Sequence, residues 1–362
     1  MKILEAFFEP VNKSLLKGIA KKETVLGNSM SIYTQKFPET RTIDVAIIGL
    51  GENANLMRPH LYKYSNRLNG LNVADFGNLK HNNTEKNLNA GLTECLIALK
   101  EESIIPIIIG EANNYIEGLI KGIDFNKIDY ALVSPQIAYD TQSIAYLLNA
   151  KNRLFHASFI AMQSYFNTND MVQDSSEVFS EHLRLGDVRA NTAIVEPLLR
   201  QADIFDFDLS AIKYSEFQSA TQQLPNGLMN HEACGICRYA GISNTLSYYL
   251  LRNFKLTANN AVDACQIAQM IWYLLDGIDN RFNDMPQLNH RNFTVYKCHA
   301  SSGIDMVFLN SNLTGRWWLQ IPPKGKGKKT APKYIGCQES DFEIAQEGDV
   351  PEKWFRAMGS NL

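Results

Sequence analysis

Short apolar segments alternate with segments of helical periodicity between about residues 40 and 280. The run DVAIIGL at 44–50 is apolar almost throughout, as expected for a strand buried on both faces of a parallel sheet. Similar runs predict further strands at 72–76, 104–109, 128–133, 154–162 and 203–209. Apolar residues three and four positions apart predict helices at 92–100, 115–121 and 261–275. This alternation predicts an α/β fold, in which helices cover both faces of a mostly parallel sheet.

The C-terminal part of the chain follows a different pattern. Three apolar segments at 293–298, 306–309 and 316–321 predict an antiparallel meander. A loop rich in lysine, glycine and proline follows, and its lysines at 324–333 indicate a solvated loop or, alternatively, an anion contact. The tail at 343–358 predicts a short terminal helix with Pro351 in its first turn. We therefore expect an α/β domain at 1–290 and a small β-rich extension at 291–362.

Composition and charge narrow the class of protein. Hydrophobic residues make up 45% of the chain, charged residues 20%, and the net charge is −3. These values are typical of a globular protein and argue against a nucleic-acid partner. The N-terminus lacks the pattern of a signal peptide, and no apolar run approaches the roughly 20 residues of a membrane span. We expect a soluble, cytoplasmic protein.

Six cysteines are scattered along the chain, and only Cys234 and Cys237 form a CxxC pair. A zinc site requires a second pair or suitably spaced histidines, and neither is evident. We interpret the pair as small residues that pack on a helix.

Five segments carry a resemblance to a known family. They are NVADFGN at 72–78, PIIIGEANNY at 106–115, IDYALVSPQIAYD at 128–140, ADIFDFDLSAI at 202–212 and LPNGLMNHEACGICRYAGIS at 224–243. In this order and spacing they resemble the motifs of the arginase/agmatinase/formimidoylglutamase (ureohydrolase) superfamily. The resemblance implies a three-layer α/β/α fold with a mostly parallel sheet.

The extension adds a second point of resemblance. RWW at 316–318 and PEKW at 351–354 match formimidoylglutamase-like members that carry a C-terminal extension. That branch is associated with bacterial protein-secretion and gliding-motility gene clusters, so the resemblance implies a protein partner there. Homo-oligomers are common in the superfamily, which leaves a trimer or hexamer open.

The superfamily's chemistry needs two Mn²⁺ ions that share a hydroxide, which attacks the amidine carbon of the substrate. Its six metal ligands, carboxylates and imidazoles, can be traced residue by residue. The first four fall on Asn113, Ser134, Gln136 and Ala138. The last two fall on Asp208 and Ser210 or, in another register, on Asp206 and Asp208. The glutamate that orients the substrate falls on Asn253.

These substitutions remove most of the negative charge that two dications require, so we expect no catalytic residue, no metal and no cofactor. Asp206 and Asp208 remain as weak candidates for a cation site or an acid/base pair. The alternative, which we prefer, is that they pair with arginines such as Arg184, Arg189 or Arg238, or with loop amides. Asp140 lies two residues beyond the last position of the second motif and is one carboxylate that a shifted loop would bring in.

We therefore hypothesise a pseudoenzyme that acts as a binding or scaffold component. One rival is a Mn²⁺-dependent hydrolase of linear amidines such as formimidoylglutamate, and another is a small-molecule sensor that uses the emptied cleft. A partner surface is expected on the extension, where Trp317, Trp318, Trp354 and Phe355 offer apolar area. The alternative is that these aromatic side chains pack the extension onto the main sheet.

Overall fold

A computed structural model describes residues 2–80, 85–110, 128–137, 154–168, 179–286, 290–322 and 332–359. In the described part, the main sheet contains ten strands in the order β1-β4-β3-β5-β10-β9-β6-β7-β8, with β2 beside β4. All neighbours are parallel except β1 and β4. The strands are β1 (Phe8–Glu9), β2 (Ser31–Ile32), β3 (Val45–Leu50), β4 (Val73–Leu79), β5 (Ile105–Gly110), β6 (Ile128–Val133), β7 (Leu154–Met162), β8 (Phe179–Arg184), β9 (Ile204–Asp208) and β10 (Tyr248–Arg252).

Helices cover both faces of this sheet, as the alternating pattern predicts. Helix α4 (Glu85–Glu101) packs on one face, where Leu92 and Leu96 join a core with Ile108. Helices α10 (Asn230–Gly241) and α11 (Ala261–Asp279) cover the other face, where Ile107 lies. Adjacent strand residues therefore enter different cores, which explains why these strands are apolar throughout.

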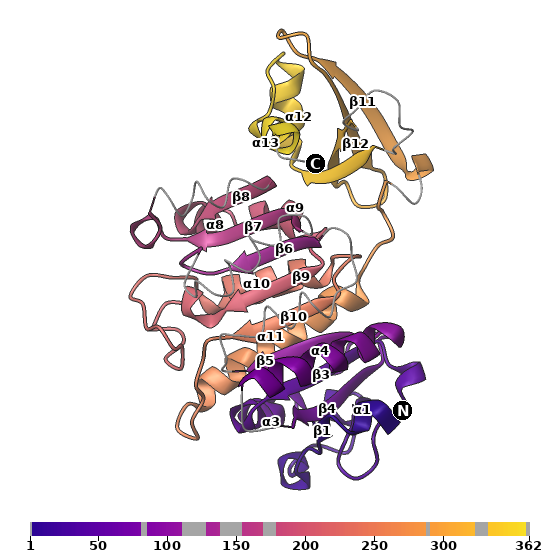
Figure 1. Cartoon of the computed structure of the whole chain (residues 1–362), viewed down its shortest axis with the longest axis vertical. Coiled ribbons are helices and arrows are strands. Elements are labelled where there is room, and N and C mark those ends of the chain that lie inside the picture. Colours follow the sequence, from indigo (N-terminus) through magenta and orange to yellow (C-terminus); the bar gives the residue numbers. More distant parts are fainter. Residues whose placement is uncertain are drawn as a thin grey trace.

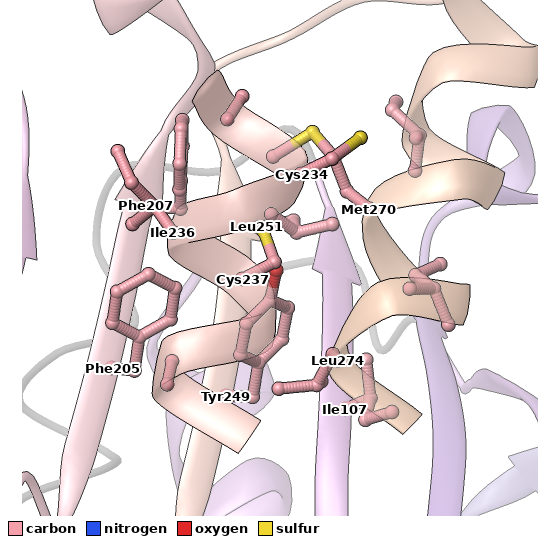
Figure 2. Packing of buried hydrophobic residues seen from close by; sticks show 14 of the residues in the cluster. Ile107, Phe205, Phe207, Cys234, Ile236, Cys237, Tyr249, Leu251, Met270 and Leu274 are labelled. Atoms are coloured by element: carbon pink, nitrogen blue, oxygen red, sulfur yellow. The ribbon is translucent and has the colours of Figure 1, made fainter. Parts of the chain in front are cut away.

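Figure 2 shows the second of these cores between the strands and the helices α10 and α11. Cys234 and Cys237 of α10 are buried there, and the Cys237 sulfur lies 2.9 Å from the Tyr249 hydroxyl oxygen. Burial raises the pKa of the Cys234 thiol to about 11, which keeps it protonated at neutral pH. The CxxC pair thus packs inside the core, as the sequence predicts.

The described residues of the main part also include the shorter helices α1 (Lys2–Glu5), α2 (Leu26–Ser29), α3 (Arg58–Leu61), α8 (Leu185–Ala190) and α9 (Glu196–Leu199). The predicted helix at 115–121 lies outside the described residues. Strands β8 and β10 and the two-residue strands β1 and β2 were not predicted, and β10 bears directly on the site below. No helix in the described part is long and apolar enough to cross a membrane.

The extension forms a separate antiparallel sheet in the order β11-β12-β13-β14. Its elements are β11 (Phe293–His299), β12 (Asp305–Ser311), β13 (Trp317–Ile321), β14 (Lys333–Cys337), α12 (Glu339–Gln346) and α13 (Glu352–Gly359). The meander is as predicted, but β14 was not. The predicted terminal helix corresponds to α13, which begins directly after Pro351. Helix α12 was not predicted as a separate helix, and the chain turns at Gly348 (φ 90°) between the two.

The extension lies at the β8 end of the main sheet (Figure 1). It contacts the segment that leads into β9: the Arg200 guanidinium donates to the Trp317 carbonyl at 2.7 Å, and its carbon lies 5.0 Å from the centre of the Trp318 ring. Gly336 lies so close to α9 that a Cβ would meet the Pro197 carbonyl oxygen at 2.4 Å. This part of the contact lies at the amino end of β9, away from the carboxyl ends where ligands of parallel sheets bind, and α13 also contacts the edge strand β8.

The extension's aromatic residues divide between packing and exposure. Trp318 is 1% exposed and lies against Arg200 of the main part, as the alternative interpretation expects. Trp317 is 8% exposed but packs inside the extension's own core against Phe342, and Trp354 packs in part against the same core. Phe355 is 53% exposed and remains available at the surface.

Candidate functional site

The candidate site lies at the carboxyl ends of three neighbouring strands. Ser134 directly follows β6, Asp208 ends β9, and Asn253 directly follows β10. The parallel register sets Arg252 beside Asp208 and Val133 beside Phe207. Positions far apart in the chain therefore meet at one edge of the sheet.

Asp208 is 1% exposed and its carboxylate is fully engaged by the protein. One oxygen accepts a hydrogen bond from the Ser210 backbone N–H at 2.8 Å. The other accepts from the Asn253 side-chain amide at 2.8 Å, and the Ser134 hydroxyl lies 3.4 Å from it. Burial raises the pKa of Asp208, and the positive charge of Arg252 together with these hydrogen bonds opposes that rise.

Asp206 is also fully buried. It lies two residues before Asp208 on β9, so both side chains point to the same face of the sheet. The Arg252 Nε–H lies 2.7 and 3.0 Å from its two oxygens, and the Tyr130 hydroxyl donates to it at 2.7 Å. Burial and the neighbouring Asp206 raise the pKa of Tyr130 well above its usual value, so this phenol stays a donor. Burial would lower the pKa of Arg252, but Asp206 and Asp208 outweigh it and raise it. Arg252 is therefore the internal counter-charge for both acids.

The sequence-based expectation about arginine partners was wrong in its choice of residue. Arg252 pairs with Asp206, whereas Arg238 pairs with Asp276 of α11 at 2.7 Å. The expectation of loop amides holds for Asp208, which accepts from the Ser210 N–H. Arg252 directly precedes Asn253 in LLRNF, so recognising 248–252 as a strand beside β9 would have identified it.

The remaining predicted positions divide into two groups. Gln136 is half-buried, and its backbone N–H donates to the Ser134 hydroxyl at 3.3 Å. The Ser210 hydroxyl accepts from the Gln222 N–H at 3.3 Å. Asn113, Ala138 and Asp140 lie outside the described residues, as does most of the lysine-rich loop.

The described side chains do not fit two Mn²⁺ ions. Both oxygens of Asp208 already accept hydrogen bonds, and both oxygens of Asp206 face a guanidinium. A divalent ion next to Arg252 would meet the like charge of a buried guanidinium. In the described ranges, no group of three or more His, Cys, Asp or Glu side chains could hold a metal ion.

Two buried polar atoms at this edge have no hydrogen-bond partner among the described residues. They are Nη1 of Arg252 and Oδ1 of Asn253, on side chains that are 4% and 0% exposed. Asn253 also has φ 64°, a left-handed conformation that is uncommon for residues other than glycine. Unpaired buried polar groups cost free energy, so binding of a polar molecule that hydrogen-bonded to these two atoms would be favourable.

Comparisons with known proteins agree with this fold. No protein-family model matches the chain, and no curated protein matches it either. Solved structures do match.

A formiminoglutamase of Trypanosoma cruzi with Mn²⁺ is 16% identical with a TM-score of 0.60, over 71% of this chain and 99% of that one. A formimidoylglutamase of Bacillus subtilis is 13% identical with a TM-score of 0.60, over 73% and 96%. An agmatine ureohydrolase of Thermoplasma volcanium is 12% identical with a TM-score of 0.54, over 73% and 97%. The matches span almost all of each relative, and about a quarter of this chain lies outside them. The chain therefore has the fold of the arginase/ureohydrolase superfamily.

Proposed function

We propose that this protein is a catalytically inactive protein of the arginase fold that serves as a binding or scaffold component. The observation that carries the proposal is the ion pair between Arg252 and Asp206 beneath the strand-end site. A guanidinium there supplies the positive charge that the superfamily obtains from metal ions. The partner class implied by the sequence resemblance is bacterial protein-secretion or gliding machinery in the cytoplasm.

The chemistry of the neighbouring side chains supports the same proposal. Ser134, Ser210 and Asn253 surround Asp208 with neutral hydrogen-bond donors, which occupy the carboxylate oxygens that a metal ion would need. A hydroxide-based hydrolysis needs a concentrated positive charge that lowers the pKa of water. Arg252 cannot do this, because its guanidinium does not coordinate water and its charge is compensated by Asp206.

The test is metal content and turnover of the purified protein. The protein is incubated with Mn²⁺, freed of excess metal, and analysed for manganese and for release of urea or formamide from guanidino and formimino substrates. The T. cruzi formiminoglutamase, whose structure contains Mn²⁺, serves as the positive control. We expect no stoichiometric manganese and no turnover. About two equivalents of manganese with turnover would establish the hydrolase and overturn the proposal.

A second candidate function is recognition of a small polar molecule at the same edge. The unpartnered Arg252 Nη1 and Asn253 Oδ1 favour it, since together they offer one donor and one acceptor. Thermal shift with arginine, agmatine and formimidoylglutamate tests this candidate. Stabilisation of the wild type that is lost in Asn253→Ala would support it, and no stabilisation by any compound would count against it.

A further inference from the structure

The extension has one long strand edge that the described parts of the chain leave open. Strand β11 is the first strand of its sheet and pairs with β12 without interruption, from Phe293 opposite Ser311 to His299 opposite Asp305. No other strand of the described chain pairs with β11. Figure 1 shows β11 at the outer margin of the extension. Such an edge offers a row of backbone donors and acceptors to another strand.

The other sheet edges are short or capped by side chains. Strand β1 has two residues. At β8, the Arg356 guanidinium donates to the Ser180 carbonyl at 3.3 Å. At β14, the Gln201 amide donates to the Tyr334 carbonyl at 2.6 Å and accepts from the Gly336 N–H at 2.7 Å. Within the described residues no side chain bonds to the backbone of β11, so its open edge is a distinct feature of this fold.

The hydrogen bonds at both ends of β11 show which residues face the open side. The Ala300 N–H donates to the Ile304 carbonyl at 2.9 Å, and the Asn312 N–H donates to the Asn292 carbonyl at 2.8 Å. Ala300 and Asn292 thus direct their backbone groups toward β12. In an antiparallel pair this direction alternates along the strand. The N–H and C=O groups of Val295 and Lys297 therefore point to the open edge.

The side chains on β11 suit a particular kind of added strand. Val295 is 50% exposed, and Tyr296 is 36% exposed with its ring centroid 4.8 Å from that of Phe342. Lys297 is exposed and forms no ion pair in the described chain, whereas His299 is bonded to Asp305 at 2.8 Å. Cross-strand neighbours favour apolar side chains opposite Val295 and Tyr296 and an acidic one opposite Lys297.

We propose that β11 is a docking edge for an extended, acidic and apolar segment of a partner protein, which adds to the sheet as a fifth strand. The inference rests on the proposed role as a binding component and names the partner's chemistry. A second copy suits this edge less well. Antiparallel self-pairing centred on Tyr296 would bring the two Lys297 side chains to diagonal positions about 7–8 Å apart, where like charges repel.

The experiment measures binding of fluorescein-labelled seven-residue peptides, the length of β11, by fluorescence anisotropy. The probe peptides carry a Val-Ile pair next to Glu, so that apolar residues lie opposite Val295 and Tyr296 and the acid lies opposite Lys297, and one control series has Lys in place of Glu. A second control series carries N-methyl groups on alternate amides, which blocks one hydrogen-bonding edge. We expect the acidic peptides to bind, the basic ones to bind at least about tenfold more weakly, and the N-methylated ones not to bind.

Protein variants separate edge pairing from general adhesion. Val295→Pro removes a donor on the open edge and leaves the ladder with β12 intact, because proline is tolerated on edge strands. We expect it to weaken binding by about tenfold or more, while the matched Val295→Thr binds as the wild type does. Lys297→Glu should reverse the preference between acidic and basic peptides. Circular dichroism confirms that each variant is folded.

Four results would overturn the proposal. The first two are that folded Val295→Pro binds the acidic peptides as tightly as the wild type does, and that the N-methylated peptides bind as tightly as the unmethylated ones. The third is that no acidic peptide reaches half-saturation at about 1 mM. The fourth is that the wild type forms a dimer that Val295→Pro dissociates. The last result would assign the edge to a second copy. Manganese content and turnover are read independently, so failure of this inference and failure of the proposed function are distinguishable.

Discussion

The two ends of the main sheet both bury charged side chains, but they employ them differently. At the carboxyl ends, Arg252 lies among Asp206 and Asp208 and compensates charge within one part of the chain. At the β8 end of the sheet, charged groups join the main part to the extension, as in the pair between Lys353 of α13 and Glu181 of the edge strand β8 at 3.1 Å. One region thus pairs its buried charges within the main part of the chain, whereas the other pairs them across an internal interface with the extension.

The junction with the extension is a network rather than a single pair. Glu196 of α9 lies between Arg200 and Arg316, and Arg316 also contacts Asp284 at 3.2 Å. Each of these charges has a partner in the described chain, in contrast to the unpartnered Nη1 of Arg252. Variants at the two ends should therefore differ in both the size and the location of their effects.

Arg252→Met should have the largest effect. It leaves Asp206 fully buried, with the Tyr130 hydroxyl as its remaining partner, and breaking a buried ion pair costs about 3–5 kcal/mol. Urea unfolding followed by circular dichroism measures the change in the free energy of unfolding. The double variant Arg252→Met with Asp206→Asn removes both charges and should recover much of the loss. If the double variant is as unstable as the single one, Arg252 does not act as a counter-charge.

Gln201→Leu should have an intermediate effect that is confined to the junction. It removes the donor to the Tyr334 carbonyl and the acceptor for the Gly336 N–H, which costs about 1–3 kcal/mol for groups left without a partner. Hydrogen exchange should become faster at 333–337 and stay unchanged in β9 and β10. Gln201→Glu keeps the acceptor and serves as the matched control, with a smaller effect at Gly336. Uniform acceleration across the main sheet would contradict a local role.

The smallest effect should come from pH. Burial, reinforced by Arg356, lowers the pKa of His182 to about 4, below the ordinary value of 6.5. The unfolded chain therefore takes up a proton before the folded one does, and stability should fall as the pH drops from about 6.5 to 4. The loss should be about 1–2 kcal/mol, since part of the ring reaches solvent. Unfolding free energies measured across this range test it.

His182→Phe is the control for that pH dependence. It retains the stacking on Phe159, whose ring centroid lies 5.2 Å away, and removes the titrating group. Glu181 should add a second loss at lower pH. Burial would raise the pKa of Glu181, but Lys353 and His156 outweigh it and hold it at about 2. Its contribution is present above pH 4.5 and is lost as the pH falls toward 2. If His182→Phe keeps the full pH dependence of stability between pH 6.5 and 4, a group other than His182 titrates in that range.

Much of the fold was predictable because its strands are apolar on both faces. Strands β6 and β7 have the predicted bounds, β3 begins one residue later than predicted, and β5 and β9 each differ by one residue at both ends. Strand β8 (FSEHLR) was missed because its polar residues face the junction with the extension. Strand β14 (KYIGC) was missed because it is short and follows the lysine-rich loop.

The sequence by itself determined which side chains stand at the strand ends, and therefore that Ser134, Gln136 and Asn253 are neutral there. Only the tertiary structure decided what the two remaining acids do. Asp206 and Arg252 are 46 positions apart in the chain, and they meet because β9 and β10 are parallel neighbours. The open edge of β11 also follows only from the tertiary structure, because it depends on which strand lies at the edge of the sheet and not on amino-acid composition. The local sequence pattern specifies the helices and strands, whereas the order of the strands in a sheet specifies which charged side chains meet and which strand edges stay open.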